Sequence, residues 1–212
     1  MTGPDTTFDA ADVVDDPTAP EWAVRTAEWI RDEVAAPAPA LGRAGALCPY
    51  IPAALRRRQV VLVECRLSGA DPAALDSWFL ARAARFRREA SARPPAEALL
   101  SCLVVVYTTL TGNEALVTGV RERVKPRLLA EGLTTGEFFP RSPDTSVRNA
   151  GFPVARAPWP ALALRHSTPH DELFLAGQPP LHRIFQASGP GIDPGTVSES
   201  LRPATADPRE TR

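Results

Sequence analysis

Apolar residues recur along this chain with two different periods, which predicts a mixture of helices and strands. A helix is predicted over residues 18–35, where apolar side chains follow one another three and four positions apart. A second helix is predicted to begin at Asp71. A third follows Asn113, with an interruption at Pro126, and a short terminal helix covers residues 181–186.

Runs of β-branched and aliphatic residues mark the expected strands. The clearest are residues 59–67 and 99–110, and the second run is the most apolar stretch of the chain, which favours a central strand. Shorter strands are expected at residues 138–139 and 161–166. The order of these elements predicts an α+β fold, in which helices pack on a mixed or antiparallel sheet.

The length of 212 residues is that of a single domain. Residues 1–17 are rich in Asp and poor in apolar side chains, so we expect a disordered acidic tail there. The α+β domain is expected over residues 18–187. Residues 188–212 are rich in Gly, Pro, Ser and Thr and are expected to form a second disordered tail.

Charge and hydropathy exclude several classes of protein. The chain has 24 basic and 25 acidic residues, so it lacks the positive excess that would neutralise a phosphate backbone. Nucleic acid is therefore not an expected partner. We expect no membrane association and a cytoplasmic location, because the N-terminus is acidic and no apolar run approaches the roughly 20 residues of a membrane span. Cys48, Cys65 and Cys102 have no metal-site or disulfide spacing and are expected to be free thiols.

All three histidines, His166, His170 and His182, fall in one C-terminal region beside carboxylates. Imidazole and carboxylate groups can bind a transition metal, which makes His166 a candidate metal ligand. Pro169 lies between the first two histidines and disrupts the helix that would align them. The alternative is that each histidine is a surface residue or ends a strand with one hydrogen bond.

Three other residues have side chains suited to a binding site. Cys48 follows a glycine-rich segment and precedes a proline, where it could be a nucleophile, a thiolate ligand or a small buried apolar residue. Glu137 lies between a glycine and two phenylalanines and could point into a pocket, and Arg148 could bind a carboxylate in bidentate fashion. Strand-end ion pairs are the alternative for both.

The same segments carry a family resemblance. The blocks Leu47-Cys48-Pro49-Tyr50-Ile51-Pro52, Gly132-Leu133 to Gly136-Glu137-Phe138, and Pro158 to His166 with Asp171 resemble those of an actinobacterial family of unknown function. The resemblance covers roughly residues 20–187. More remotely, the Pro-Cys block and the Arg-containing C-terminal block are similar to YqcI/YcgG-type proteins, which include haem-dependent N-hydroxylases.

This remote similarity implies a haem-dependent oxygenase that hydroxylates nitrogen on an amine- or guanidine-bearing small molecule, in bacterial specialised metabolism. It would make His166 the axial haem ligand, with Cys48 as the second choice. Arg165 or Arg43 would pair with a haem propionate, and Glu137 would hold the cationic group of the substrate. We therefore expect the three blocks to converge on one pocket. The alternative is a non-catalytic protein that binds a small molecule or a partner in a biosynthetic cluster.

Overall fold

A five-stranded sheet with the order β1-β2-β3-β7-β4 forms the centre of the molecule. The computed structural model describes residues 6–42, 45–146, 149–192 and 195. The strands are β1 (Thr7–Asp9), β2 (Val60–Glu64), β3 (Cys102–Val106), β4 (Leu133–Phe138), β5 (Thr145–Ser146), β6 (Asn149–Pro153) and β7 (Ala161–His166). Strands β2 and β3 pair in parallel, the other pairs are antiparallel, and β5 and β6 form a separate hairpin. The α+β class with a mixed sheet is confirmed.

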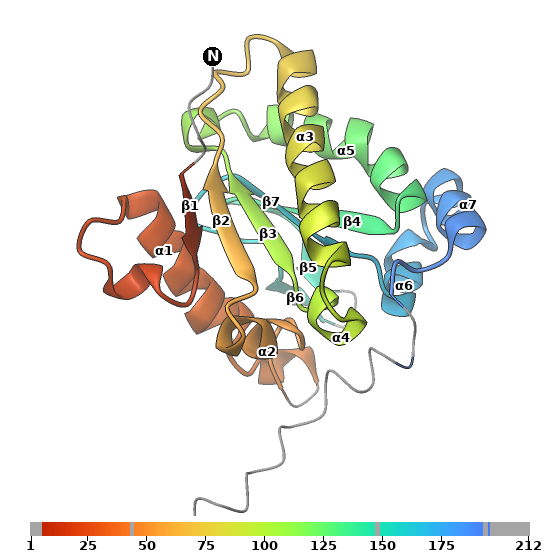
Figure 1. The fold of residues 1–212 in the computed structure, drawn as a ribbon, viewed down its shortest axis with the longest axis horizontal. Helices are drawn as coiled ribbons and strands as arrows, with labels where there is room; N and C mark the ends of the chain where they lie inside the picture. Colours follow the sequence, from red (N-terminus) through yellow and green to blue (C-terminus); the bar gives the residue numbers. More distant parts are fainter. Residues whose placement is uncertain (1–5, 43–44, 147–148, 193–194, 196–212) are drawn as a thin grey trace, which may run out of the picture.

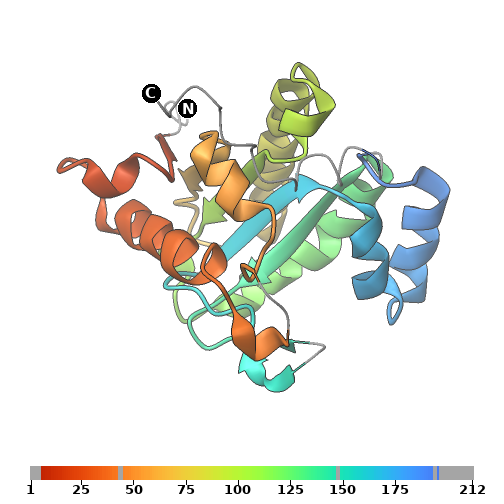
Figure 2. The same cartoon turned by 90° about the horizontal axis from the view of Figure 1, so that it is seen from below.

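Helices cover both faces of this sheet (Figure 1). They are α1 (Glu21–Trp29), α2 (Ile51–Arg56), α3 (Pro72–Ser91), α4 (Pro95–Ala98), α5 (Glu114–Ala130), α6 (Glu172–Leu175) and α7 (Pro179–Ser188). Helices α3 and α5 lie side by side over one face. Helix α1 packs on the other face, where Trp22 contacts Phe8 of β1 and Trp29 contacts Phe138 of β4. Figure 2 shows α6 and α7 grouped at the opposite end of the molecule from α1.

Most of the predicted helices are found close to their expected positions. The helix expected over residues 18–35 is α1 followed by a π-helical turn, Ile30–Val34. Helix α3 begins as expected, because the Asp71 carboxylate accepts hydrogen bonds from the next backbone amides. Helix α5, however, runs through Pro126 without the expected interruption. We attribute this to the buried residues on both sides of the proline, which hold the two halves of the helix on the sheet.

The N-terminal segment differs from the expected acidic tail. Residues Thr7–Asp9 form β1, and Ala10 and Val13 are buried in the core. This short segment is ordered because it pairs with β2, where Phe8 lies beside Leu62 in the ladder. In the described part of the chain, no helix is both long and apolar enough to cross a membrane.

At the other end, the chain continues past α7 and packs back on the domain. Ile192 is buried among core residues, and the amide of Gly191 donates a hydrogen bond to the Ser167 hydroxyl at 2.9 Å. The backbones of Gly191 and Gly132 approach so closely that a Cβ atom on Gly191 would lie 1.9 Å from the Gly132 carbonyl oxygen. The packed chain therefore extends at least to Ile192.

Candidate functional site

The predicted site residues on β4 and β7 do not all lie on one face of the sheet. Successive side chains of a strand point to alternate faces, so Arg165 and His166 project in opposite directions. His166 contacts Phe86 of α3, and Glu137 pairs with Arg121 of α5. Both residues therefore face the α3 and α5 layer, whereas Arg165 faces the other side.

His166 is enclosed on its face of the sheet. The residue is 7% exposed, and its ring centroid lies 5.9 Å from that of Phe86. Neither ring nitrogen has a hydrogen bond of good geometry within the described residues. Burial lowers the pKa of His166 below its ordinary value, and the nearby backbone of Gly132 offsets part of this effect. The imidazole is therefore neutral at pH 7.

The lowered pKa of His166 predicts a loss of stability in acid. Below about pH 6.5 the unfolded chain takes up a proton that the folded chain accepts only at lower pH, so the free energy of unfolding falls across this window. Replacing His166 by Leu should remove this part of the pH dependence, as measured by urea unfolding at pH 7.5 and 5.5. The matched control is His170→Gln, because His170 is exposed. An equal pH dependence in wild type and His166→Leu would contradict the prediction.

Glu137 shares the face of His166 but lies at the other end of the ladder. Its Cα partner on β7 is Leu162, four residues before His166, so the two are about 13 Å apart along the strand. The Glu137 carboxylate lies 3.0 Å from the Arg121 guanidinium, and its side chain is only 13% exposed. Lys125, one helical turn beyond Arg121, has a pKa lowered first by burial and then by the Arg121 charge. Glu137 is thus engaged in an ion pair, one of the alternatives that its sequence position allowed.

Arg165 belongs to a network of hydrogen bonds on the other face of the sheet. Its guanidinium donates two hydrogen bonds to the Asp171 carboxylate, at 2.7 and 2.8 Å. The Asp171 carboxylate also accepts a bond from the Thr168 amide at 2.7 Å. Burial raises the pKa of Asp171, but the Arg165 charge and these hydrogen bonds outweigh burial and lower it overall. The pair fixes the turn that follows β7.

Two thiols and a phenol surround this ion pair. Cys102 is the Cα partner of Arg165 on β3, and burial raises the pKa of its thiol to about 12. Cys48 is half-buried and lies close enough to Cys102 and Arg165 that a negative charge on its sulfur would raise the pKa of both groups. The Tyr50 hydroxyl is buried near Thr168 without a hydrogen bond of good geometry. All three cysteines are free thiols in the structure.

The sheet therefore separates the predicted residues into two groups rather than bringing them into one pocket. Cys48 and Arg165 lie on one face, and His166 and Glu137 lie on the other. Arg43 and Arg148 fall outside the described residues. The sequence contained the signal for this separation, because adjacent residues of one strand cannot share a face.

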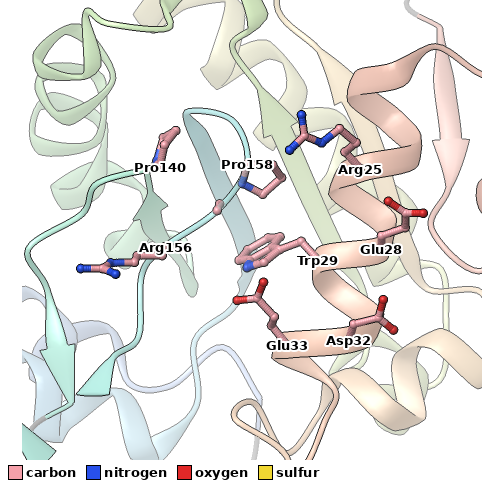
Figure 3. A pocket seen from close by; sticks show the side chains of 9 residues that line it. Arg25, Glu28, Trp29, Asp32, Glu33, Pro140, Arg156 and Pro158 are labelled. Carbon is pink, nitrogen blue, oxygen red and sulfur yellow. The ribbon is translucent and has the colours of Figure 1, made fainter. Parts of the chain in front are cut away.

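The described residues contain a different concave surface, which lies between α1 with its π-helical turn and the loops that follow β4 and precede β7. It has a volume of about 430 Å³. Figure 3 shows Trp29 at its centre, with the Glu33 carboxylate beside the indole ring and the Arg25 guanidinium at the opposite end, near Pro158. We call this surface the Trp29 hollow; its lining residues are Arg25, Glu28, Trp29, Asp32, Glu33, Pro140, Arg156, Ala157 and Pro158.

Helical spacing places the main groups of the Trp29 hollow in one stripe. Arg25, Trp29 and Glu33 are four residues apart, the spacing that repeats along one side of a helix. The π-helical turn begins directly after Trp29, and its widened hydrogen bond joins the Ala35 amide to the Ile30 carbonyl at 2.8 Å. Such turns are frequent at functional sites.

Trp29 is one of the apolar side chains spaced along one face of the helix predicted over residues 18–35, and the structure shows that it also lines a hollow. The indole is 8% exposed and packs edge to face on Phe138, with ring centroids 5.2 Å apart. The remaining exposed part faces the Trp29 hollow. The four-residue spacing of the stripe could be seen in the sequence. The opposite wall could not be predicted from it, because that wall comes from loops more than 100 residues away.

A metal centre is not supported by the arrangement of the acidic, histidine and cysteine side chains. His166 lies in β7, His170 is exposed, and His182 on α7 contacts the Glu172 carboxylate at 3.0 Å. Among the residues that the structure describes, no three such side chains are grouped closely enough to bind a metal ion.

Comparison with known proteins identifies a family but no characterised relative. A search of the curated proteins gave no match, and neither did a search of the solved structures. The profile of a domain of unknown function, DUF6875, matches residues 23–188, which run from within α1 to the end of α7 and include the Trp29 hollow and every strand of the five-stranded sheet except β1. The chain therefore belongs to the DUF6875 family.

Proposed function

We propose that this protein binds a small molecule with an amine or guanidine cation in the Trp29 hollow. The observation that carries the proposal is the position of Trp29 at the centre of a concave surface, with a carboxylate beside the ring. A volume of about 430 Å³ lies in the range of ordinary ligand pockets, about 300–1,000 Å³. This is the non-catalytic alternative that the sequence left open, at a site that the sequence did not identify.

The chemistry of the hollow favours a cation. The π face of an indole attracts an ammonium or guanidinium group, and the effect is larger when the group is partly desolvated. Glu33 adds a negative charge beside the ring and has no ion pair with another described residue. Because Phe138 fixes the orientation of the Trp29 ring, little side-chain entropy is lost on binding.

Hexylammonium is a simple probe for this proposal, and its binding can be followed by titration calorimetry. We expect Trp29→Leu to weaken binding by about 5- to 30-fold, the size of a partly desolvated cation–π contact. Trp29→Phe should retain part of the affinity, which guards against a loss of folding in the first variant. The matched control is Trp78→Leu, because Trp78 lies on α3 under Arg82, away from the hollow.

Two results would contradict the proposal. One is a folded wild-type protein that does not bind hexylammonium. The other is binding that is unchanged in both Trp29 variants, since the cation would then lie elsewhere on the protein.

The haem-dependent hydroxylation expected from the sequence stays a prediction, and the residues proposed to hold haem do not fit that group in this structure. The imidazole of His166, which has no hydrogen bond of good geometry to another described residue, offers a ligand nitrogen, but the ring is enclosed against Phe86. His166 lines neither the Trp29 hollow nor the hollow beside Arg87 and Arg88. Arg165 is engaged by Asp171, and Cys48 lies on the opposite face of the sheet from His166. We therefore derive no reaction through haem.

A further inference from the structure

We infer that the ligand of the Trp29 hollow carries a negative group as well as a positive one, with the two groups at opposite ends of a short chain. This inference rests on the proposed function and adds a second contact to it. Arg25 binds the anionic end, Trp29 and Glu33 bind the cationic end, and the middle of the ligand lies along the uncharged part of the lining.

The order of groups along α1 carries this inference. Figure 3 shows Arg25, Trp29 and Glu33 following one another along the helix, with the indole between the two charges. The other charged side chains of the lining are directed elsewhere: the Glu28 and Asp32 carboxylates and the Arg156 guanidinium point away from Trp29. One positive and one negative group therefore flank the ring.

Both charged groups are available to a ligand. Among the residues that the structure describes, Arg25 forms an ion pair only with Glu21, at 3.5 Å between two side chains that are 56% and 74% exposed, so the pair contributes little. Asp32 provides the contrast, because Arg31 donates two short hydrogen bonds to its carboxylate, at 2.7 and 2.9 Å. The charge of Asp32 is thus compensated within the helix, and that of Glu33 is not compensated by any residue described.

The spacing of the two charges selects the kind of ligand. Arg25 and Glu33 are eight positions apart along α1 and the π-helical turn that follows it, which is about 12 Å at the rise of an α-helix. Where the Arg25 and Glu33 side chains bend toward Trp29, the gap between their charges is shorter. An α-amino acid, whose two charges are adjacent, still cannot contact both side chains. A chain of about five methylene groups between the charges suits the gap better. The ligand class is therefore an ω-amino or ω-guanidino carboxylate.

The uncharged part of the lining suits such a chain. Pro140, Ala157 and Pro158 line the hollow and offer no charged or hydrogen-bonding side-chain group. Methylene groups that pack on this surface leave water, which favours binding.

The experiment compares three probes of similar length by titration calorimetry: 6-aminohexanoate, hexylammonium and hexanoate. We expect 6-aminohexanoate to bind at least about fivefold more tightly than hexylammonium, and hexanoate to bind most weakly, because an additional ion pair of about 1 kcal/mol gives this ratio. Arg25→Gln should abolish the preference for 6-aminohexanoate over hexylammonium. Glu33→Gln should weaken the binding of both amines. Glycine should not compete with 6-aminohexanoate.

The outcomes separate this inference from the proposed function. If hexylammonium binds in a Trp29-dependent way but 6-aminohexanoate binds no more tightly, the second contact is wrong and the cation site stands. A preference for 6-aminohexanoate that persists in Arg25→Gln would also overturn the inference. If none of the amines binds to the folded protein, the proposed function fails together with it.

Discussion

Replacing Asp171 by Ala is expected to lower the free energy of unfolding by about 3 kcal/mol, the lower end of the range for breaking a buried ion pair. The carboxylate is 7% exposed, and its loss would leave the Arg165 guanidinium and the Thr168 amide without their partner. The Arg165 side chain is 30% exposed, so water compensates part of the loss, which is why we expect the lower value. Urea unfolding at pH 7 measures the effect.

Two further measurements identify the ion pair as the cause. The double variant Arg165→Met/Asp171→Ala should lose less stability than the sum of the two single variants, because it leaves no buried charge unpaired. The lowered pKa of Asp171 also predicts that the contribution is present above about pH 4 and is lost as the pH falls through the folded-state pKa. Additive effects in the double variant would show that the two side chains act independently.

Replacing Gly191 by Ala is expected to cost about 2–4 kcal/mol, since the new Cβ atom would displace the segment that buries Ile192. The clash is with backbone, at 1.9 Å from the Gly132 carbonyl oxygen, and Gly132 is held between α5 and β4. Moving the segment would also break the bond from the Gly191 amide to Ser167. Chemical denaturation measures the loss, and hydrogen exchange at the Ile192 amide locates it.

Gly177→Ala is the matched control for this prediction. Gly177 is exposed, its φ lies outside the left-handed region, as does that of Gly191, and a Cβ atom there would meet nothing within 4 Å, so a change of no more than about 0.5 kcal/mol is expected. A loss in Gly191→Ala no larger than in Gly177→Ala would show that the close approach of the two glycines does not determine how this segment packs.

The parts of the fold that could be predicted from sequence are those with a strong local signal. The apolar run around Val104 forms the centrally placed β3, and the Asp71 cap begins α3 as expected. Strand β1 was missed because it has only three residues, Thr7–Asp9, and its order depends on a partner more than 50 residues away. The hairpin of β5 and β6 was missed for a similar reason, since its residues have no alternating apolar pattern.

The candidate site was harder to predict because a site depends on which segments meet. Glu137 and His166 were expected in a shared pocket, but the helices over the sheet cover both of them. Trp29 fitted the apolar face of a helix, and the sequence does not show that Pro140 and Pro158 lie across from it. Strand alternation was the one available signal that could have separated Arg165 from His166 before the structure was known.

The position of β7 within the sheet has a consequence for how the chain folds. Strand β4 pairs only with β7 in the sheet, and β7 lies between β4 and β3 although it follows β4 by more than 20 residues. Until residues 161–166 join the sheet, β4 has no strand beside it and exposes its backbone hydrogen-bonding groups on both edges. The parallel pair of β2 and β3 can form earlier, but the sheet closes only when Ala161–His166 enters the gap. Insertion of a late strand between two early ones requires contacts between distant parts of the chain, which slows folding and lengthens the period in which β4 can associate with other chains.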